Sequence, residues 1–132
     1  MLMRWALLLL AAAILAAGPA HADEHEEKLF KILTEEYGLP KEVARCSIAA
    51  DKAMAKDKSY DRFGWEQQNK GAWRSVEADG LFSETKKIRI DRLVYLTGQA
   101  RTRNSEWKDG QVVCGLKDGK VVGFDLAVPP AY

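Results

Sequence analysis

The residue types that most often carry acid–base or nucleophilic chemistry near neutral pH are scarce in this chain. It contains two histidines and two cysteines. His21 falls in an apolar leader and His25 follows closely, in a stretch where a precise catalytic geometry is not expected. These residues do not suffice for a Ser-His-Asp or Cys-His arrangement or for an ordinary zinc site. We therefore expect no catalytic, cofactor-binding or metal-binding residue, and no cofactor.

Carboxylates are plentiful, with 19 Asp and Glu side chains in the chain. Most glycosidases place two carboxyl groups across the bond that they cleave. The pairs Asp57/Asp61 and Glu77/Asp79 are candidates of this kind, but nothing in their spacing distinguishes them from ordinary surface acids. The sequence therefore favours a protein that is not an enzyme, and a carboxylate-dependent enzyme acting on a glycan is the alternative.

Arg89, Arg101 and Arg103 are candidate binding residues. Their residue numbers are all odd, and side chains two positions apart in a strand lie on the same face. On extended strands, these three residues of the same parity would therefore lie on one exposed sheet face. Guanidinium groups on such a face could bind an anionic glycan, a lipid head group or an acidic patch of a protein. The alternative is a sheet edge that carries charge to prevent aggregation.

Trp65 is the candidate among the tryptophans for an exposed ring. It follows Gly64 in a polar segment, residues 60–70, that is expected to connect two elements. Trp73 and Trp107 belong to segments with an alternating pattern and are expected to pack within a sheet. Trp65 is therefore the better surface candidate, and it would offer its ring to a sugar or a partner.

Residues 1–22 have the pattern of a secretory signal peptide. A basic residue is followed by an almost unbroken run of Leu, Ala and Ile, and a small-x-small motif precedes the predicted cleavage between Ala22 and Asp23. The apolar run is short for a membrane span and acidic residues follow it; a retained N-terminal anchor is the alternative. No cysteine lies near the cleavage site. We expect a periplasmic or secreted protein without a lipobox or a membrane span, with residues 23–132 forming a single small domain.

Cys46 and Cys114 both lie in the predicted mature part. In an exported protein, an isolated pair of cysteines most economically forms one disulfide. By closing a long loop, it would contribute on the order of 4 kcal/mol to stability in the chain-entropy account. Two unpaired buried thiols are the alternative.

Basic and acidic side chains balance once the leader, with Arg4, is removed. A chain without net charge has no global field to attract nucleic acid or anionic lipid. The charges are unevenly distributed, since the charged side chains are mainly acidic in residues 23–42 and mainly basic in residues 86–103. This asymmetry could steer the approach of a binding partner, or it could reflect two solvated surfaces. We expect no nucleic-acid partner. An envelope protein or an anionic glycan is the expected partner, and the oligomeric state stays open.

The elements that must position these residues begin with two helices. Apolar residues recur every four positions over residues 24–37, and Gly38 fits the end of that helix. Pro40 can begin a second helix, residues 40–58, whose many alanines allow close packing. Cys46 falls on the buried side of this second helix.

Alternation of apolar and polar residues replaces the helical pattern in the second half of the chain. The predicted strands comprise residues 72–78, 87–96, 111–116 and 121–128. Asp118-Gly119 predicts a tight hairpin between the last two strands, and Asp79-Gly80 predicts another turn. The sequence therefore predicts an α+β fold: two N-terminal helices packed on one face of an antiparallel sheet of about four strands, with one helix-to-sheet disulfide.

A set of motifs from about residue 46 to residue 125 carries a family resemblance. It consists of a cysteine on an alanine-rich helix, Gly98-Gln99-Ala100-Arg101, Trp107, Val113-Cys114-Gly115, and Asp118-Gly119-Lys120-Val121 through Phe124. This pattern resembles small exported bacterial domains of the BspC type and, more loosely, other two-cysteine exported domains of unknown function. The resemblance implies the fold and the compartment, and it carries over no catalytic residue. We expect an exported non-catalytic binding or structural module of the cell envelope; a carboxylate-dependent enzyme on envelope glycan and an inhibitor of a secreted hydrolase are the alternatives.

Overall fold

The computed structural model describes residues 20–130 of the chain, with side chains described from Glu24 onward. Most of the predicted signal peptide, residues 1–19, therefore lies outside the described residues. The predicted cleavage junction between Ala22 and Asp23 falls within the backbone of the first helix, α1 (Ala20–Lys31). Within the described range, no helix is long and apolar enough to cross a membrane.

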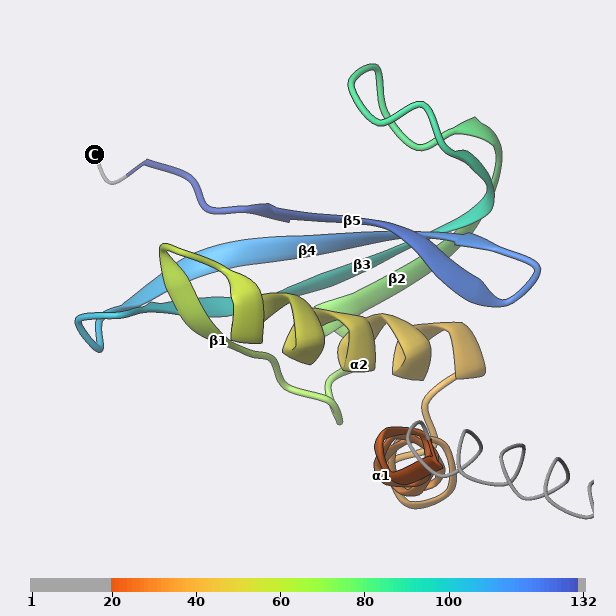
Figure 1. Ribbon diagram of the computed structural model, residues 1–132, viewed down its shortest axis with the longest axis horizontal. Helices are drawn as coiled ribbons and strands as arrows, with labels where there is room; N and C mark the ends of the chain where they lie inside the picture. The colour runs from red at the N-terminus through yellow and green to blue at the C-terminus, as the bar shows by residue number, and fades with distance from the viewer. Residues whose placement is uncertain (1–19, 131–132) are drawn as a thin grey trace, which may run out of the picture.

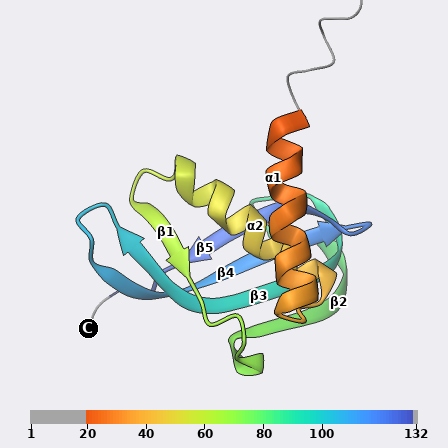
Figure 2. The ribbon, with the colours of Figure 1, turned by 90° about the horizontal axis from the view of Figure 1, so that it is seen from below.

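Two α-helices precede the strands of one antiparallel sheet, which confirms the predicted α+β class (Figure 1). After α1, the elements are the π-helical turn η1 (Ile32–Glu36), α2 (Lys41–Lys56), β1 (Tyr60–Gly64), the short 3-10 turn η2 (Lys70–Ala72), β2 (Trp73–Leu81), β3 (Arg89–Thr102), β4 (Trp107–Lys117) and β5 (Lys120–Ala127). The sheet has five strands, one more than the sequence predicts, and it curls around α2 (Figure 2).

The helix α2 packs against the sheet through one apolar side. Its buried residues recur at intervals that place them on one side of a helix with 3.6 residues per turn. They are Val43, Ala44, Cys46, Ser47, Ile48, Ala50 and Met54. A fully buried side chain of the Val, Ile or Met type contributes about 1.5–3 kcal/mol, so this side of α2 holds the two layers together.

The first helix, α1, packs mainly on α2, whose direction it crosses (Figure 1). Phe30 of α1 lies under the Arg45 guanidinium, 3.8 Å from the ring centroid, and Glu26 forms an ion pair with Lys52. The prediction that two helices cover one face of the sheet therefore holds for α2, with α1 as a further layer. An apolar stripe indicates that one side of a helix is buried, but it does not specify the element that buries it.

The sheet has the strand order β1-β3-β4-β5, and β2 also pairs with β3. β2 pairs with residues 89–96 and β1 with residues 99–102, so these two strands follow one another along the same edge of β3. Thr97 and Gly98 are left between them. The prediction of residues 60–70 as a connection is wrong for β1, which escapes a search for alternation because Phe63 is its one buried residue.

The side of β3 that faces α2 carries the core. Val94 and Leu96 are fully buried there and stand opposite Cys114 and Val112 of β4. The residues between them in sequence point to the other face of the sheet, because side chains alternate along a strand. This outer face, away from α2, carries several residues of the candidate site.

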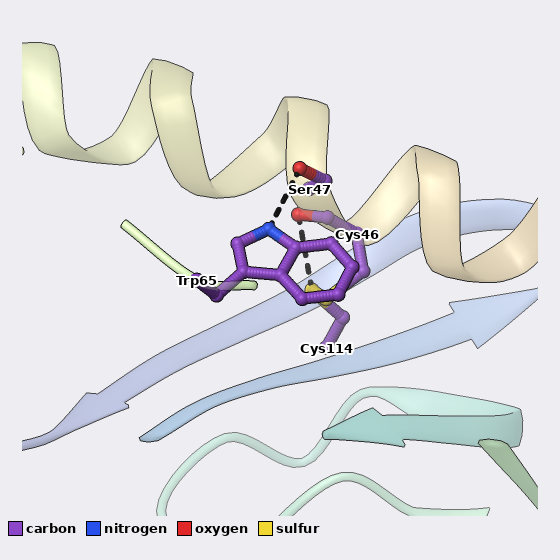
Figure 3. The surroundings of a disulfide bond; sticks show 4 residues. All are labelled: Cys46, Ser47, Trp65 and Cys114. Carbon is purple, nitrogen blue, oxygen red and sulfur yellow. Dashed lines mark hydrogen bonds between the residues drawn. A yellow bond between two sulfur atoms is a disulfide. The ribbon is translucent and has the colours of Figure 1, made fainter. Parts of the chain in front are cut away.

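The predicted disulfide between Cys46 and Cys114 is present and joins α2 to β4 (Figure 3). The two Cα atoms are 5.7 Å apart, and both residues are fully buried. The indole of Trp65 lies beside the bridge, and its N–H donates to Ser47 Oγ at 3.1 Å (Figure 3). Cys114 Sγ also lies 3.7 Å from the Cys46 carbonyl oxygen; because a bridged sulfur carries no proton, this is a contact and not a hydrogen bond.

The two predicted turns have different outcomes. The hairpin turn at Asp118-Gly119 is confirmed, with φ values of 51° and 78°. The turn predicted at Asp79-Gly80 is instead a register shift within β2, because pairing with β3 continues past it. The chain reverses over residues 82–88, in a loop that stands on the face of the sheet opposite α2 (Figure 1).

Candidate functional site

A hollow opens on the sheet where β1 separates from β3 and before β2 begins. Its volume is about 670 Å³. The end of β1, the segment that follows it, the middle of β3 and the start of β4 form its walls. The lining residues are Gly64, Trp65, Glu66, Asn69, Gly71, Ala72, Thr97, Gly98, Gln99, Trp107 and Asp109.

At the end of β1, the chain crosses closely over Gly98 of β3 at Gly64 and Trp65. A Cβ atom on Gly98 would lie 2.1 Å from the Gly64 carbonyl oxygen and 2.9 Å from Trp65 Cβ, so only glycine permits this crossing without a shift. Beyond it, Trp65 turns its indole toward α2 and donates to Ser47. Trp65, predicted to expose its ring, therefore lines the hollow but is only partly exposed.

Trp107 forms the exposed wall of the hollow. It is the first residue of β4, stands opposite Arg101 of β3, and is 47% exposed. A Cβ on Gly64 would lie 3.6 Å from Trp107 Cζ3, so the far end of the indole reaches over β1. The prediction that Trp107 packs within the sheet is therefore wrong for much of its side chain. Asp109, two positions later in β4 and therefore on the same face of the strand as Trp107, is the signal that favours exposure of this face.

Polar side chains with defined hydrogen bonds form the rest of the rim. Gln99 Nε2 donates to Asp109 Oδ1 at 3.3 Å across β3 and β4. On the other side of the hollow, Asn69 Oδ1 accepts from the Gly71 N–H at 2.9 Å, and Asn69 Nδ2 donates to Glu66 Oε2 at 3.3 Å. Because a carboxylate accepts several hydrogen bonds, Asp109 and Glu66 keep acceptor capacity for a ligand.

The hollow has an acidic character. Glu66 and Asp109 are the ionisable side chains among the described lining residues, and none of these residues is Lys or Arg. Two carboxylates in one hollow repel an anion and leave room for hydroxyl or amine donors. Neither residue is distinguishable in the sequence, because an acid in a polar segment has no pattern that separates it from other surface acids.

Arg101 lies behind Trp107 and is already paired. Its Nε and Nη2 donate to the two carboxylate oxygens of Asp61 at 2.8 and 3.0 Å. Hydrogen bonding to Arg101 lowers the pKa of Asp61, and the same bond raises the pKa of Arg101. The Arg101 guanidinium also lies 5.9 Å from the centroid of the Trp107 ring. This arginine therefore fixes β1 to β3 beside the hollow.

The structure does not bring the three predicted arginines together. Arg103 follows β3 and donates from Nε to the Lys58 carbonyl oxygen at 3.1 Å and from Nη2 to that of Asp57. Arg89 is exposed at the opposite end of β3. A shared parity places side chains on one face of a strand, but it does not make them neighbours when the strand is this long.

The predicted carboxylate pairs have other contacts and do not line the hollow. Asp57 Oδ1 accepts from the backbone N–H groups of Ser59 and Tyr60, and Asp61 is held by Arg101. Glu77 Oε1 lies 3.6 Å from Nη2 of Arg92, its partner where β2 pairs with β3. None of the four acids, Asp79 included, is among the described lining residues of the hollow.

The described residues thus define a small α+β domain with an open hollow of mixed aromatic and polar character. Among them, no group of three or more His, Cys, Asp or Glu side chains is arranged to hold a metal ion. Comparison with known protein families, with curated proteins and with solved structures gives no match. The site is therefore interpreted from its own geometry.

Proposed function

We propose that the chain is an exported, non-catalytic binding module of the cell envelope and that the hollow beside Trp107 is its binding site. Export is inferred from the pattern of residues 1–22, which indicates a periplasmic or secreted location. A buried disulfide is compatible with an oxidising compartment. The observation that carries the choice of site is the half-exposed indole at the rim of a polar hollow.

The physical support is the cost of leaving such a ring in water. Full burial of a large apolar side chain contributes about 1.5–3 kcal/mol of favourable free energy. Because about half of the Trp107 side chain is exposed, a ligand that covers it would gain part of this free energy. The hydrogen bonds of Gln99 with Asp109 and of Asn69 with Glu66 orient the polar groups in advance. Pre-oriented groups lose less freedom on binding, so this hollow is suited to recognition.

Catalysis by carboxylates is the second candidate, because Glu66 and Asp109 both line the hollow. Such an enzyme would use one carboxyl as an acid and the other as a base or nucleophile. It predicts turnover of a glycan that disappears in Glu66→Gln or Asp109→Asn. A binding module predicts retention of the ligand without any change in it.

The experiment compares retention on purified insoluble envelope material. Protein recovered from expression of the full chain is sedimented with this material as wild type, as Trp107→Ala and as Leu81→Ala. Leu81 is an exposed apolar residue outside the hollow, so its variant is a matched control. We expect Trp107→Ala to weaken retention about ten-fold, or about 1.4 kcal/mol, with Leu81→Ala unchanged. Equal retention of the wild type and Trp107→Ala would refute this site.

A further inference from the structure

A second hollow adjoins the one beside Trp107. Its volume is about 530 Å³, and its lining residues are Tyr37, Glu66, Gln67, Gln68 and Asn69. Glu66 and Asn69 line both hollows, so the segment of residues 66–69 is their common wall. Tyr37, at the C-terminal end of η1, is 40% exposed. The two hollows therefore meet at residues 66–69 and together make one surface, with Trp107 in the first hollow and Tyr37 in the second.

This surface has an aromatic ring on each side and polar groups between. Trp107 and Tyr37 are the exposed rings. The polar side chains of the two linings are carboxylates, amides and a hydroxyl, namely Glu66, Gln67, Gln68, Asn69, Thr97, Gln99 and Asp109. Neither lining contains Lys or Arg among the described residues. The surface is thus rich in hydrogen-bonding groups, aromatic at both ends and without a cation.

This combination matches the chemistry of a carbohydrate. A pyranose ring presents a C–H face that packs on an aromatic ring and a rim of hydroxyls that donate to carboxylates and amides. Glu66 and Asp109 would repel a uronate or a sulfate, which disfavours an anionic glycan and leaves a neutral one as the ligand to test. Because Trp107 and Tyr37 line different hollows, one sugar ring would pack on one of them, and a ligand that contacts both would be a chain of sugars.

We propose that the two hollows bind one uncharged oligosaccharide, with one sugar packed on Trp107, another on Tyr37, and the units between them hydrogen-bonded to residues 66–69. This inference rests on the proposed function and names the ligand class of that site. It differs from the anionic glycan predicted from Arg89, Arg101 and Arg103. Two of those arginines donate to acceptors within the chain, and the three do not lie together.

The test is a calorimetric titration with N-acetylglucosamine and glucose oligomers of one to six units, and with an oligogalacturonate as the anionic comparison. We expect affinity to rise with length and then to level off once both aromatic residues are reached. We expect the oligogalacturonate to bind at least ten-fold more weakly than a neutral oligomer of the same length.

The two aromatic residues give a sharper readout. Trp107→Ala should weaken binding of every oligomer about ten-fold or more, whereas Tyr37→Ala should weaken binding of long oligomers and leave a disaccharide unchanged. Ile32→Ala is the matched control, since Ile32 is an exposed apolar residue of η1 outside both linings. Thermal unfolding of each variant checks that the fold is kept. Equal losses for short and long oligomers in Tyr37→Ala would overturn the continuous site.

Failure of this inference is distinguishable from failure of the proposed function. If Trp107→Ala loses retention on envelope material but no neutral oligomer binds, the ligand class is wrong and the binding module stands. Tighter binding of the oligogalacturonate would likewise overturn the ligand class. Shortening of an oligomer, abolished by Glu66→Gln or Asp109→Asn, would support the ligand class and overturn the non-catalytic assignment.

Discussion

At the scale of single residues, the two tryptophans of the hollow have exchanged the roles that the sequence suggests. Trp65 lies in a polar segment but donates its N–H to Ser47 and lies beside the disulfide. Trp107 begins a strand but keeps about half of its surface exposed. Both outcomes depend on contacts between distant parts of the chain, such as the passage of the Trp107 ring over Gly64. Local sequence patterns do not contain this information.

The ion pair between Asp61 and Arg101 makes stability depend on pH. Because the hydrogen bond to Arg101 lowers the pKa of Asp61 in the folded state, the pair stabilises the fold above the unfolded-state pKa of about 3.9. This contribution is lost as the pH falls through the lowered, folded-state pKa. We expect the free energy of unfolding of Asp61→Asn to be lower than that of the wild type at pH 6, and the difference to shrink toward pH 2. Urea unfolding across this range measures it.

The control for this prediction is Asp79→Asn, which changes an exposed acid of β2 outside the pair. It should keep the acid dependence of the wild type. Added salt should reduce the effect of Asp61→Asn, because the pair is partly open to solvent and exposed charges are screened. A constant difference between Asp61→Asn and the wild type at every pH would contradict the role of the pair.

At the scale of elements, the four longer strands are predictable and the fifth is not. β2, β3, β4 and β5 each overlap a segment in which apolar and polar residues alternate. β1 has one buried residue, and its pairing is set by β3, with Phe63 opposite Ala100. The site forms where β1 ends, so the position of the hollow could not be derived from the sequence. It follows from β1 and β2 sharing one edge of β3, which is longer than either of them.

Gly98 is the residue on which this arrangement depends. We expect Gly98→Ala to lower the free energy of unfolding by about 1–3 kcal/mol, the range for overpacking, because its Cβ would lie 2.1 Å from the Gly64 carbonyl oxygen. Gly64→Ala is the matched control, since its Cβ would meet Trp107 at an ordinary 3.6 Å. It should change stability by no more than about 0.5 kcal/mol. Urea unfolding compares the two, and equal effects would show that the crossing at Gly98 is not tight.

At the scale of the whole molecule, the order of helical and alternating segments, together with two cysteines behind a predicted leader, is sufficient to predict an α+β domain with one bridge. The disulfide joins the helix layer to the sheet through two fully buried residues. The placement of α1 on α2 was not predictable, because its apolar residues can be covered by a helix as well as by a sheet. Layer order depends on pairing between elements, which a single sequence leaves open.

The disulfide and the predicted leader together predict the compartment in which the domain reaches full stability. The disulfide closes a span of 68 residues, and removing a native disulfide from a small secreted domain costs about 2–5 kcal/mol of stability. Expression of the full chain should therefore yield a product that begins at Asp23, with the Cys46 and Cys114 peptides joined in a non-reduced digest. The same residues 23–132 made in a reducing cytoplasm should carry free thiols and unfold at a lower urea concentration, and oxidation should remove the difference. Free thiols in the product of the full chain would contradict the prediction that the bridge forms in an oxidising compartment. Retention of residues 1–22 would contradict the predicted cleavage before Asp23.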